Sequence, residues 1–297
     1  MVGIPDIYLA HRECESISAA CAAYGHQAAV SGIMLSVSET AFIGIDLAWR
    51  GEKPSGGAVL KGDRRCARLI EVVPLVSFAA VLAFVETHAK DPAVVAIDAP
   101  LIIRNHTGQR RCETAVSKYY GARHASCHTS NLSLYPDPVS VRLASELISR
   151  GFRHAPDVTH PENGLVMLEV YPHAALIELF RLPRILRYKK GNIATKRSGQ
   201  RDLQQRLRGL SLLAPPLEPT ARLSEYLGAD VNSVRGAALK AYEDGLDAIL
   251  CAYIAYYYWF WGSGGTRLFG DMDSGYIIVP AGPNNPPQLN QISPRAV

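Results

Sequence analysis

Acidic residues interrupt several of the most apolar segments of this chain. Asp46 lies in AFIGIDLAW, Asp98 in VVAIDAPL and Glu169 in LVMLEVYP, three segments with the pattern of buried strands. Asp244 and Asp247 lie in AYEDGLDAILCAY, which has the pattern of a helix. A carboxylate in an apolar strand is costly unless it is neutralised, hydrogen-bonded or bound to a metal. The pattern therefore predicts that these acids gather around a compensating cation, for which a divalent metal is the simplest candidate.

Length and composition indicate a globular protein. The chain has 297 residues, 48% of them hydrophobic, and a formal net charge of +4, which does not by itself imply a polyanionic partner. Its six cysteines lack paired spacing, so we expect a reduced, cytoplasmic protein. The uncharged run Ala248–Gly265 has too short an apolar part for the roughly 20 residues of a membrane span, so no membrane partner is expected.

The periodicity predicts one folded domain over residues 41–280, preceded by a poorly structured extension (1–40) and followed by a mobile Pro- and Asn-rich tail (281–297). Strands are predicted at 41–48, 58–61, 67–73, 93–101 and 165–171, and helices at 75–89 and 235–261. Two helical insertions are expected near 101–163 and 174–235. The predicted fold class is α/β, with a mixed five-stranded sheet of three antiparallel and two parallel strands, flanked by helices. This order is typical of the ribonuclease H-like topology.

Several motifs, taken in order, resemble those of domain-of-unknown-function family 429. They are GIDLAW, IDAPL, GQRRCE, EVYPHA, RYKKGN, DGLDAILCAY and GDMDSGYIIVP, and together they cover about Ala41 to Pro280. The resemblance implies a ribonuclease H-like nuclease. It brings no established substrate, since a fold does not determine a function.

In ribonuclease H-like enzymes, acids on the first and fourth strands and on the last helix carry catalysis. The resemblance therefore implies Asp46 and Asp98 as catalytic metal ligands, with Asp247 or Asp244 as the third. Such carboxylates hold Mg²⁺ or Mn²⁺, and two ions about 4 Å apart can activate water and stabilise a departing oxyanion.

One acid of that enzyme pattern is missing. Ribonucleases H have a glutamate early in the first crossover helix, but the predicted helix here begins PLVSFAAVL. Glu169 or Glu113 could substitute as a catalytic or metal-binding acid. Alternatively, the missing acid favours a noncatalytic nucleic-acid or nucleotide-binding protein.

A basic stretch provides candidate phosphate contacts. From Arg181 to Arg208 there are ten Lys or Arg residues and a single acid, Asp202. Lys189 and Lys190 could contact phosphate, with Tyr188 stacking on an unpaired base, and Arg111 could act likewise from the loop after Asp98. A nucleic acid or nucleotide is the predicted partner, and no protein partner can be deduced. A solvated helix face is the alternative reading.

A third functional class also fits the predicted sheet. Kinases of the actin-like superfamily share it, and GIDLAWRGEKPSGG is similar to their first phosphate hairpin. These kinases also need a second Gly-rich phosphate turn beside an acid. The sequence between Asp98 and Glu169 contains none, so an ATP-dependent phosphotransferase is the least favoured class.

Overall fold

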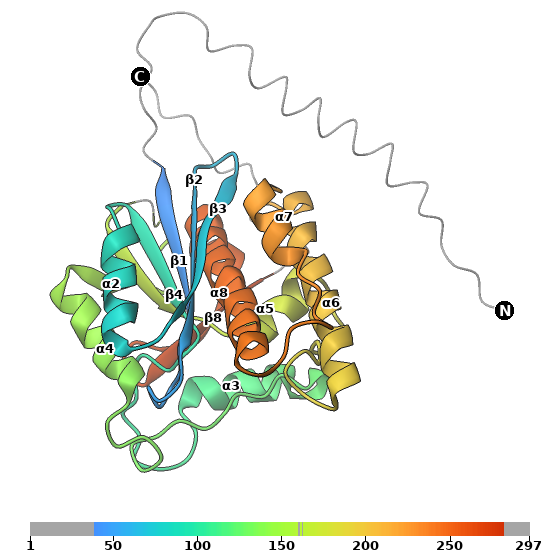
Figure 1. The fold of residues 1–297 in the computed structure, drawn as a ribbon. Coiled ribbons are helices and arrows are strands. Elements are labelled where there is room, and N and C mark those ends of the chain that lie inside the picture. Colours follow the sequence, from blue (N-terminus) through green and yellow to red (C-terminus); the bar gives the residue numbers. More distant parts are fainter. Residues whose placement is uncertain (1–38, 160, 162, 282–297) are drawn as a thin grey trace, which may run out of the picture. The chain divides into compact units, whose positions relative to one another are not determined.

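The computed structural model describes residues 39–159, 161 and 163–281 (Figure 1). The predicted extension and tail lie outside this range, apart from Glu39, Thr40 and Ala281. In chain order the elements are β1 (Thr40–Asp46), β2 (Ser55–Gly62), β3 (Ala67–Leu75), α2 (Phe78–His88), β4 (Ala93–Ile97), α3 (Arg111–Tyr120), α4 (Val139–Ser149), β5 (Phe152–His154), β6 (Leu165–Glu169), α5 (Pro172–Leu179), α6 (Ile193–Arg208), α7 (Ala221–Leu227), α8 (Gly236–Trp261), β7 (Thr266–Asp271) and β8 (Gly275–Pro280).

The central sheet has six strands in the order β3-β2-β1-β4-β6-β5. β2 runs antiparallel to β1 and β3, whereas β1, β4, β6 and β5 are mutually parallel neighbours. The α/β class and the mixed sheet are confirmed, but the predicted count of five strands is wrong. The additional strand, β5, lies in the segment predicted as a helical insertion. Its three residues are too few to show the alternation that identifies a strand in sequence.

The hairpin β7–β8 forms a separate two-stranded sheet in a segment for which no strand was predicted. Several predicted boundaries also differ: the strand predicted at 93–101 ends at Ile97, and the one predicted at 58–61 spans Ser55–Gly62. The predicted helix at 75–89 begins later, at Phe78, because the Ser77 side chain caps it by accepting from the Ala80 amide at 3.1 Å. Pro74 and Leu75 belong instead to β3, an edge strand, where a missing amide donor is tolerated.

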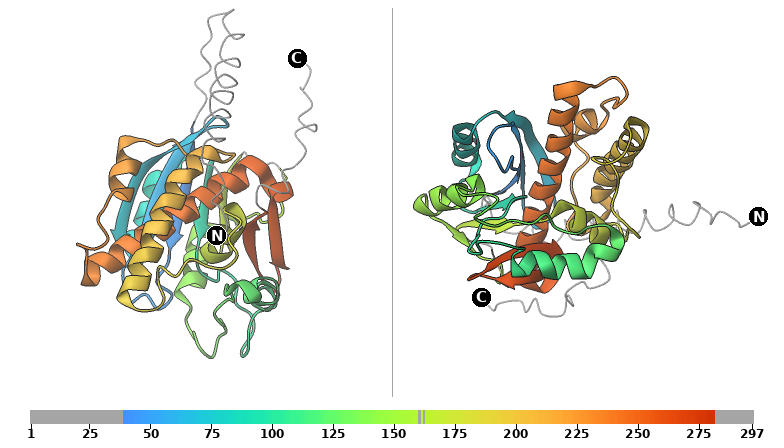
Figure 2. Two further views of the ribbon diagram at one scale, coloured as in Figure 1. Left: turned by 90° about the vertical axis from the view of Figure 1, so that its right-hand side faces the viewer. Right: turned by 90° about the horizontal axis from the view of Figure 1, so that it is seen from below.

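Helices cover both faces of the sheet (Figures 1 and 2). α2 and α4 lie on one face, where they pack against Ile43 and Ile45. α8 and α5 cover the other face, which contains Phe42, while α7 packs beside α8 on the edge strand β3 and α6 lies outside α8. Successive side chains of a strand point to opposite faces, so Phe42, Gly44 and Asp46 face α8.

Glycines let α8 approach the sheet closely. A Cβ on Gly44 would stand 2.0 Å from the Ala248 carbonyl oxygen, and one on Gly56 would stand 2.2 Å from that of Asp244. Both distances are far inside van der Waals contact, so a side chain at either position would push the helix away. The two glycines thus fix how deeply the acidic turn of α8 sits against β1 and β2.

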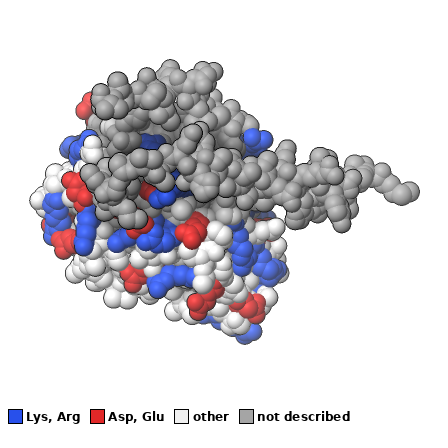
Figure 3. Space-filling model, turned by 90° about the horizontal axis from the view of Figure 1, so that it is seen from above, with Lys and Arg blue, Asp and Glu red and all other residues white. Residues whose placement is uncertain are grey.

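None of the helices within the described part of the chain is long and apolar enough to cross a membrane. Figure 3 views the molecule from the end opposite the carboxyl ends of the parallel strands. Where that face is described, Lys and Arg are interspersed with Asp and Glu, so charges of both signs share it.

Candidate functional site

Two of the predicted acids meet at the carboxyl ends of adjacent parallel strands. Asp46 is the last residue of β1. Asp98 directly follows β4, and its amide donates to the Ile45 carbonyl at 2.9 Å. By strand alternation both residues belong to the face covered by α8. Loops at the carboxyl ends of parallel strands commonly form ligand sites in α/β sheets.

α8 brings the other two aspartates to this point, and a lysine bridges one of them, Asp247, to Asp46 of β1. The Lys189 ammonium lies 3.1 Å from Asp46 Oδ2 and also forms an ion pair with Asp247. Asp247 Oδ1 additionally accepts a hydrogen bond from the Tyr188 hydroxyl at 2.7 Å. Asp244 pairs with Lys240 one turn earlier on α8. Four carboxylates therefore share two ammonium groups.

Burial and the neighbouring charges shift the pKa values of the acids in this cluster. Burial raises the pKa of Asp98 well above its usual range, and the nearby Asp46 charge raises that pKa further. Burial likewise raises the pKa of Asp46 and raises the pKa of Asp244 to about 6. For Lys189, burial lowers the pKa, but Asp247 and Asp46 outweigh it and hold the pKa well above normal. The lysine therefore stays charged, while the acids compete for protons or cations.

The raised pKa values of these aspartates predict that the stability of the domain depends on pH. Aspartates in an unfolded chain ionise near pH 3.9. Between that pH and the raised pKa values of Asp98 and Asp244, the folded protein holds protons that the unfolded chain has lost. The free energy of unfolding should therefore fall as pH rises from about 4 through 6 and beyond. Asp98→Asn should raise the melting temperature at pH 7 by a few degrees and flatten this slope, as measured by calorimetry at several pH values. A slope unchanged in the variant would contradict a raised pKa for Asp98.

Glu169 and Glu113 lie in a different, buried ion-pair network around Arg110. The guanidinium contacts both Glu169 oxygens, at 2.5 and 2.9 Å, and Glu113 Oε1 at 2.9 Å. Glu169 also accepts from the Leu101 amide at 2.8 Å, and Glu113 from the Ser130 amide at 3.1 Å. On β6, Glu169 alternates with Leu168, which packs on the α8 face, so it does not share that face with Asp46. The partners of both glutamates indicate that they hold the loop after β4.

The predicted phosphate contacts have different surroundings. Tyr188 is fully buried, so its ring is not available to stack on a base, and its hydroxyl orients Asp247 instead. Lys189 belongs to the carboxylate cluster, whereas its neighbour Lys190 is exposed. Arg111 is exposed at the start of α3, where its charge acts on Asp271 of the β7–β8 hairpin.

Comparison with family models identifies the chain. The model described as "Protein of unknown function (DUF429)" matches residues 44–273, most of the described domain. The chain belongs to this family. No curated protein and no solved structure gave a significant match.

In this DUF429 domain the carboxylates suit a divalent cation by chemistry, since Mg²⁺ and Mn²⁺ prefer hard oxygen ligands. Within residues 39–159, 161 and 163–281, however, no three His, Cys, Asp or Glu side chains are grouped so that they could hold a metal ion. Lys189 contacts both Asp46 and Asp247, so its ammonium serves as the shared cation of these two carboxylates. A metal shared by the same pair would require the lysine to move.

His173, at the start of α5, adjoins the cluster of the DUF429 domain. Its ring lies 5.3 Å from that of Tyr188, and burial, followed by the charges of Lys189 and Lys190, lowers its pKa to about 3. The imidazole is therefore neutral at physiological pH. Among the described residues, its buried Nδ1 has no hydrogen-bonding partner.

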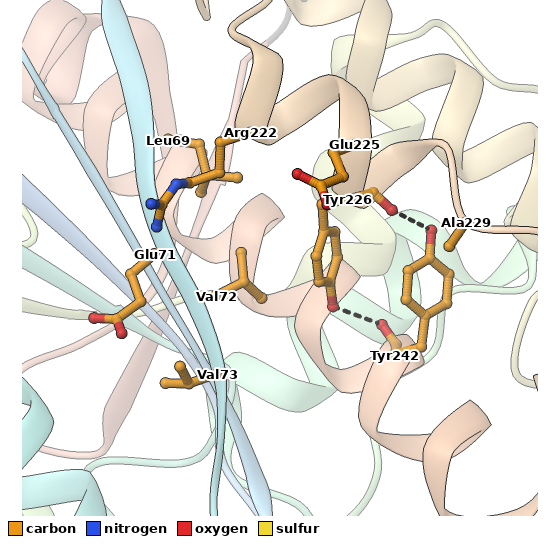
Figure 4. Close-up of a pocket in the computed structure, with 9 residues that line it drawn as sticks. All are labelled: Leu69, Glu71, Val72, Val73, Arg222, Glu225, Tyr226, Ala229 and Tyr242. Atoms are coloured by element: carbon orange, nitrogen blue, oxygen red, sulfur yellow. Dashed lines mark hydrogen bonds between the residues drawn. The ribbon is translucent and has the colours of Figure 1, made fainter.

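A hollow lies elsewhere in the domain, between β3, α7 and the first turns of α8 (Figure 4). It measures about 440 Å³, and its lining includes Val72, Arg222 and two tyrosines. Figure 4 shows Tyr226 and Tyr242 joined by two hydrogen bonds, of 3.4 and 3.1 Å. Neither Asp46 nor Asp98 lines this hollow, so it is separate from the carboxylate cluster.

The sequence did not predict the roles of two residues near the acids, Arg110, which was expected only among the basic residues that could hold a phosphate, and Trp49. Arg110 stands beside Arg111 in GQRRCE, and its spacing of three from Glu113 is the signal for the ion pair that forms. Trp49 follows Asp46 by three positions, and its indole N–H donates to the Asp98 carbonyl at 3.2 Å. No periodicity in the sequence indicates this second contact, because it joins two loops that are 49 residues apart.

Proposed function

We propose that this DUF429 protein is a divalent-metal-dependent hydrolase of phosphodiesters in nucleic acids or nucleotides, built on a ribonuclease H-like fold. The strand order β3-β2-β1-β4-β6 with α8 across one face supports that fold, and β5 extends it. The observation that carries the proposal is the convergence of Asp46 and Asp98, from adjacent parallel strands, with Asp244 and Asp247 of α8.

The charge balance of the cluster supports a divalent cation. Among the described residues, Lys189 and Lys240 are the cations that pair with this cluster, so two negative charges stay uncompensated when Asp46, Asp98, Asp244 and Asp247 all ionise. Burial is the main cause of the raised pKa of Asp98, and the excess of negative charge is the second. Asp46 and Asp98 are each partly exposed, so they are the residues that would hold an arriving ion.

A bound divalent ion would supply an activated water and would stabilise the leaving oxyanion. Lys189, once released from Asp46, would be free to neutralise a substrate phosphate, and the exposed Lys190 beside it would add a second contact. Tyr188 keeps Asp247 oriented through its buried hydrogen bond. Glu169 and Glu113 hold the loop after Asp98 through Arg110 and have no place in the proposed chemistry.

Asp46→Asn tests this proposal. Asn keeps the shape of the side chain and removes the charge, so Mn²⁺ binding and Mn²⁺-dependent cleavage of single-stranded oligonucleotides should both fall at least about 100-fold. The fold should survive, because a neutral amide is cheaper to bury than the aspartate whose pKa burial raises. Calorimetric titration with Mn²⁺, thermal melting and a cleavage assay measure the three effects.

Asp202→Asn is the matched control, since Asp202 is an exposed acid on α6 and should leave all three readouts unchanged. If the wild-type protein neither responds to Mn²⁺ nor cleaves, and Asp46→Asn unfolds, then Asp46 is a structural partner of Lys189. The hydrolase would then be abandoned for a noncatalytic binding protein on the same fold.

A further inference from the structure

We infer that Trp49, Tyr135 and His128 form a stacking platform for an unpaired nucleobase at the rim of the carboxylate cluster. The inference rests on the proposed function and narrows its substrate to single-stranded nucleic acid or free nucleotides. We refer to these three residues, with Arg50, as the aromatic rim. They come from two loops at the carboxyl ends of the parallel strands.

Trp49 is held rigidly beside the acids. It lies in a tight turn after β1, closed by the Gly51 amide donating to the Ala48 carbonyl at 2.9 Å. Gly51 has φ +69°, a left-handed conformation that favours glycine. The indole N–H is fixed on the Asp98 carbonyl, and the ring packs against the core formed by α2 and α4. Even so, Trp49 is only half-buried, so part of this large apolar ring is left at the surface.

The second loop sets two more rings against Trp49. The Tyr135 ring lies 5.7 Å from it at an interplanar angle of 68°, and the His128 ring lies 6.4 Å away at 85°. Tyr135 is half-buried and His128 exposed. Asn131 orders the loop, since it accepts from the Leu134 amide at 2.9 Å and donates to the Gly108 carbonyl at 2.9 Å. The rings are therefore in place before any ligand arrives.

Charge beside the aromatic rim favours a nucleotide over a neutral aromatic ligand. The exposed Arg50 guanidinium lies 5.4 Å from the centre of the Tyr135 ring. On the cluster side, the Trp49 indole N–H donates to the Asp98 carbonyl at 3.2 Å, so the ring adjoins the carboxylates directly. A base on the rings would thus have the Arg50 guanidinium near it for its phosphate and the proposed reaction centre beside it. Base–aromatic stacking is tolerant of sequence, because every base has a π-face, but a base inside a duplex cannot use it.

The experiment compares two probes of equal charge without divalent metal, so that cleavage plays no part. One is a short fluorescent oligothymidylate, and the other is the same oligomer with abasic sites in place of the bases. The wild-type protein should bind the oligothymidylate about tenfold more tightly than the abasic oligomer, and more tightly than the corresponding duplex. Equal affinity for the two single strands would overturn the inference.

Three variants of Trp49 and Tyr135 distinguish base stacking by these rings from a purely structural role. Trp49→Ala should abolish the preference for base-bearing strands. Trp49→Phe loses the hydrogen bond to the Asp98 carbonyl but keeps an aromatic ring, so it should retain most of that preference. Tyr135→Leu should reduce the preference. The matched control is Tyr119→Leu, because Tyr119 is a surface tyrosine that, like Tyr135, lies under an arginine, here Arg267 at 4.4 Å. If Trp49→Ala and Trp49→Phe lose the preference equally, with equally lowered melting temperatures, Trp49 only anchors the hairpin and the inference fails.

The hydrolase proposal and the base-stacking inference can be disproved independently of each other. Lys190→Ala should weaken binding of the two single-stranded probes alike and lower the salt dependence by about one charge, because Lys190 is exposed whereas Lys189 stays paired with Asp46 and Asp247 without metal. A protein that prefers bases but never cleaves would retain the aromatic rim and lose the hydrolase. A protein that cleaves with Mn²⁺ but binds abasic and base-bearing strands equally would do the reverse.

Discussion

Replacing Arg110 with methionine is expected to destabilise the domain by about 3–5 kcal/mol, because it leaves two buried carboxylates without their cation. Arg110 is 3% exposed, Glu169 3% and Glu113 1%, so water cannot take over the role of the guanidinium. Burial already raises the pKa of Glu169, and Arg110 is the main influence that lowers it. Chemical denaturation at pH 7 measures the loss.

Two further variants identify the cause. Arg123→Met breaks an ion pair with Glu178, of 3.1 Å, in which the arginine side chain is 30% exposed to water, and should cost less than about 1 kcal/mol. Adding Glu169→Met to Arg110→Met removes one of the stranded charges and should restore part of the lost stability. If the double variant is no more stable than Arg110→Met, the loss of packing rather than the stranded carboxylate explains the effect.

Gly44→Ala is expected to cost about 3 kcal/mol or more, and the variant is expected to accumulate as insoluble protein. The new methyl carbon would stand 2.0 Å from the Ala248 carbonyl oxygen and 2.2 Å from the Ala252 amide nitrogen. Both are backbone atoms in the middle of α8, so no side-chain rotation relieves the clash. Either α8 moves away from β1 or the sheet distorts, and each change separates Asp247 from Asp46.

Gly209→Ala serves as the control for the effect of replacing a glycine. Gly209 ends α6 with φ −67°, a conformation open to alanine, and a Cβ there meets nothing within 4 Å. This variant should be as stable as the wild type or up to about 1 kcal/mol more stable. A Gly44→Ala protein that melts within a degree or two of the wild type would show that α8 does not press on β1 as closely as described.

The parallel core of the sheet follows from local pattern. β1, β4 and β6 are continuous apolar runs, and α8 is a long apolar helix predicted at 235–261 and found at Gly236–Trp261. Burial on both faces requires such runs, so the sequence records them directly. β5 escaped detection because its three residues are too few to show alternation, and β7 because its residues are mostly exposed without a regular alternation. β8 is a continuous buried run, so its own pattern was sufficient to predict a strand.

Sequence alone determined which acids lie at strand ends and on α8, because an acid inside an apolar run is visible as an exception to the pattern. It did not determine which cation each acid would face. Lys189 comes from a basic stretch 143 residues after Asp46, and Arg110 reaches Glu169 across 59 residues. Burial and the closeness of α8 to the sheet made these pairs, and both depend on contacts between segments remote in sequence. For that reason the acids could be predicted from the chain, whereas their division between the Lys189 cluster and the Arg110 network was decided by the tertiary structure.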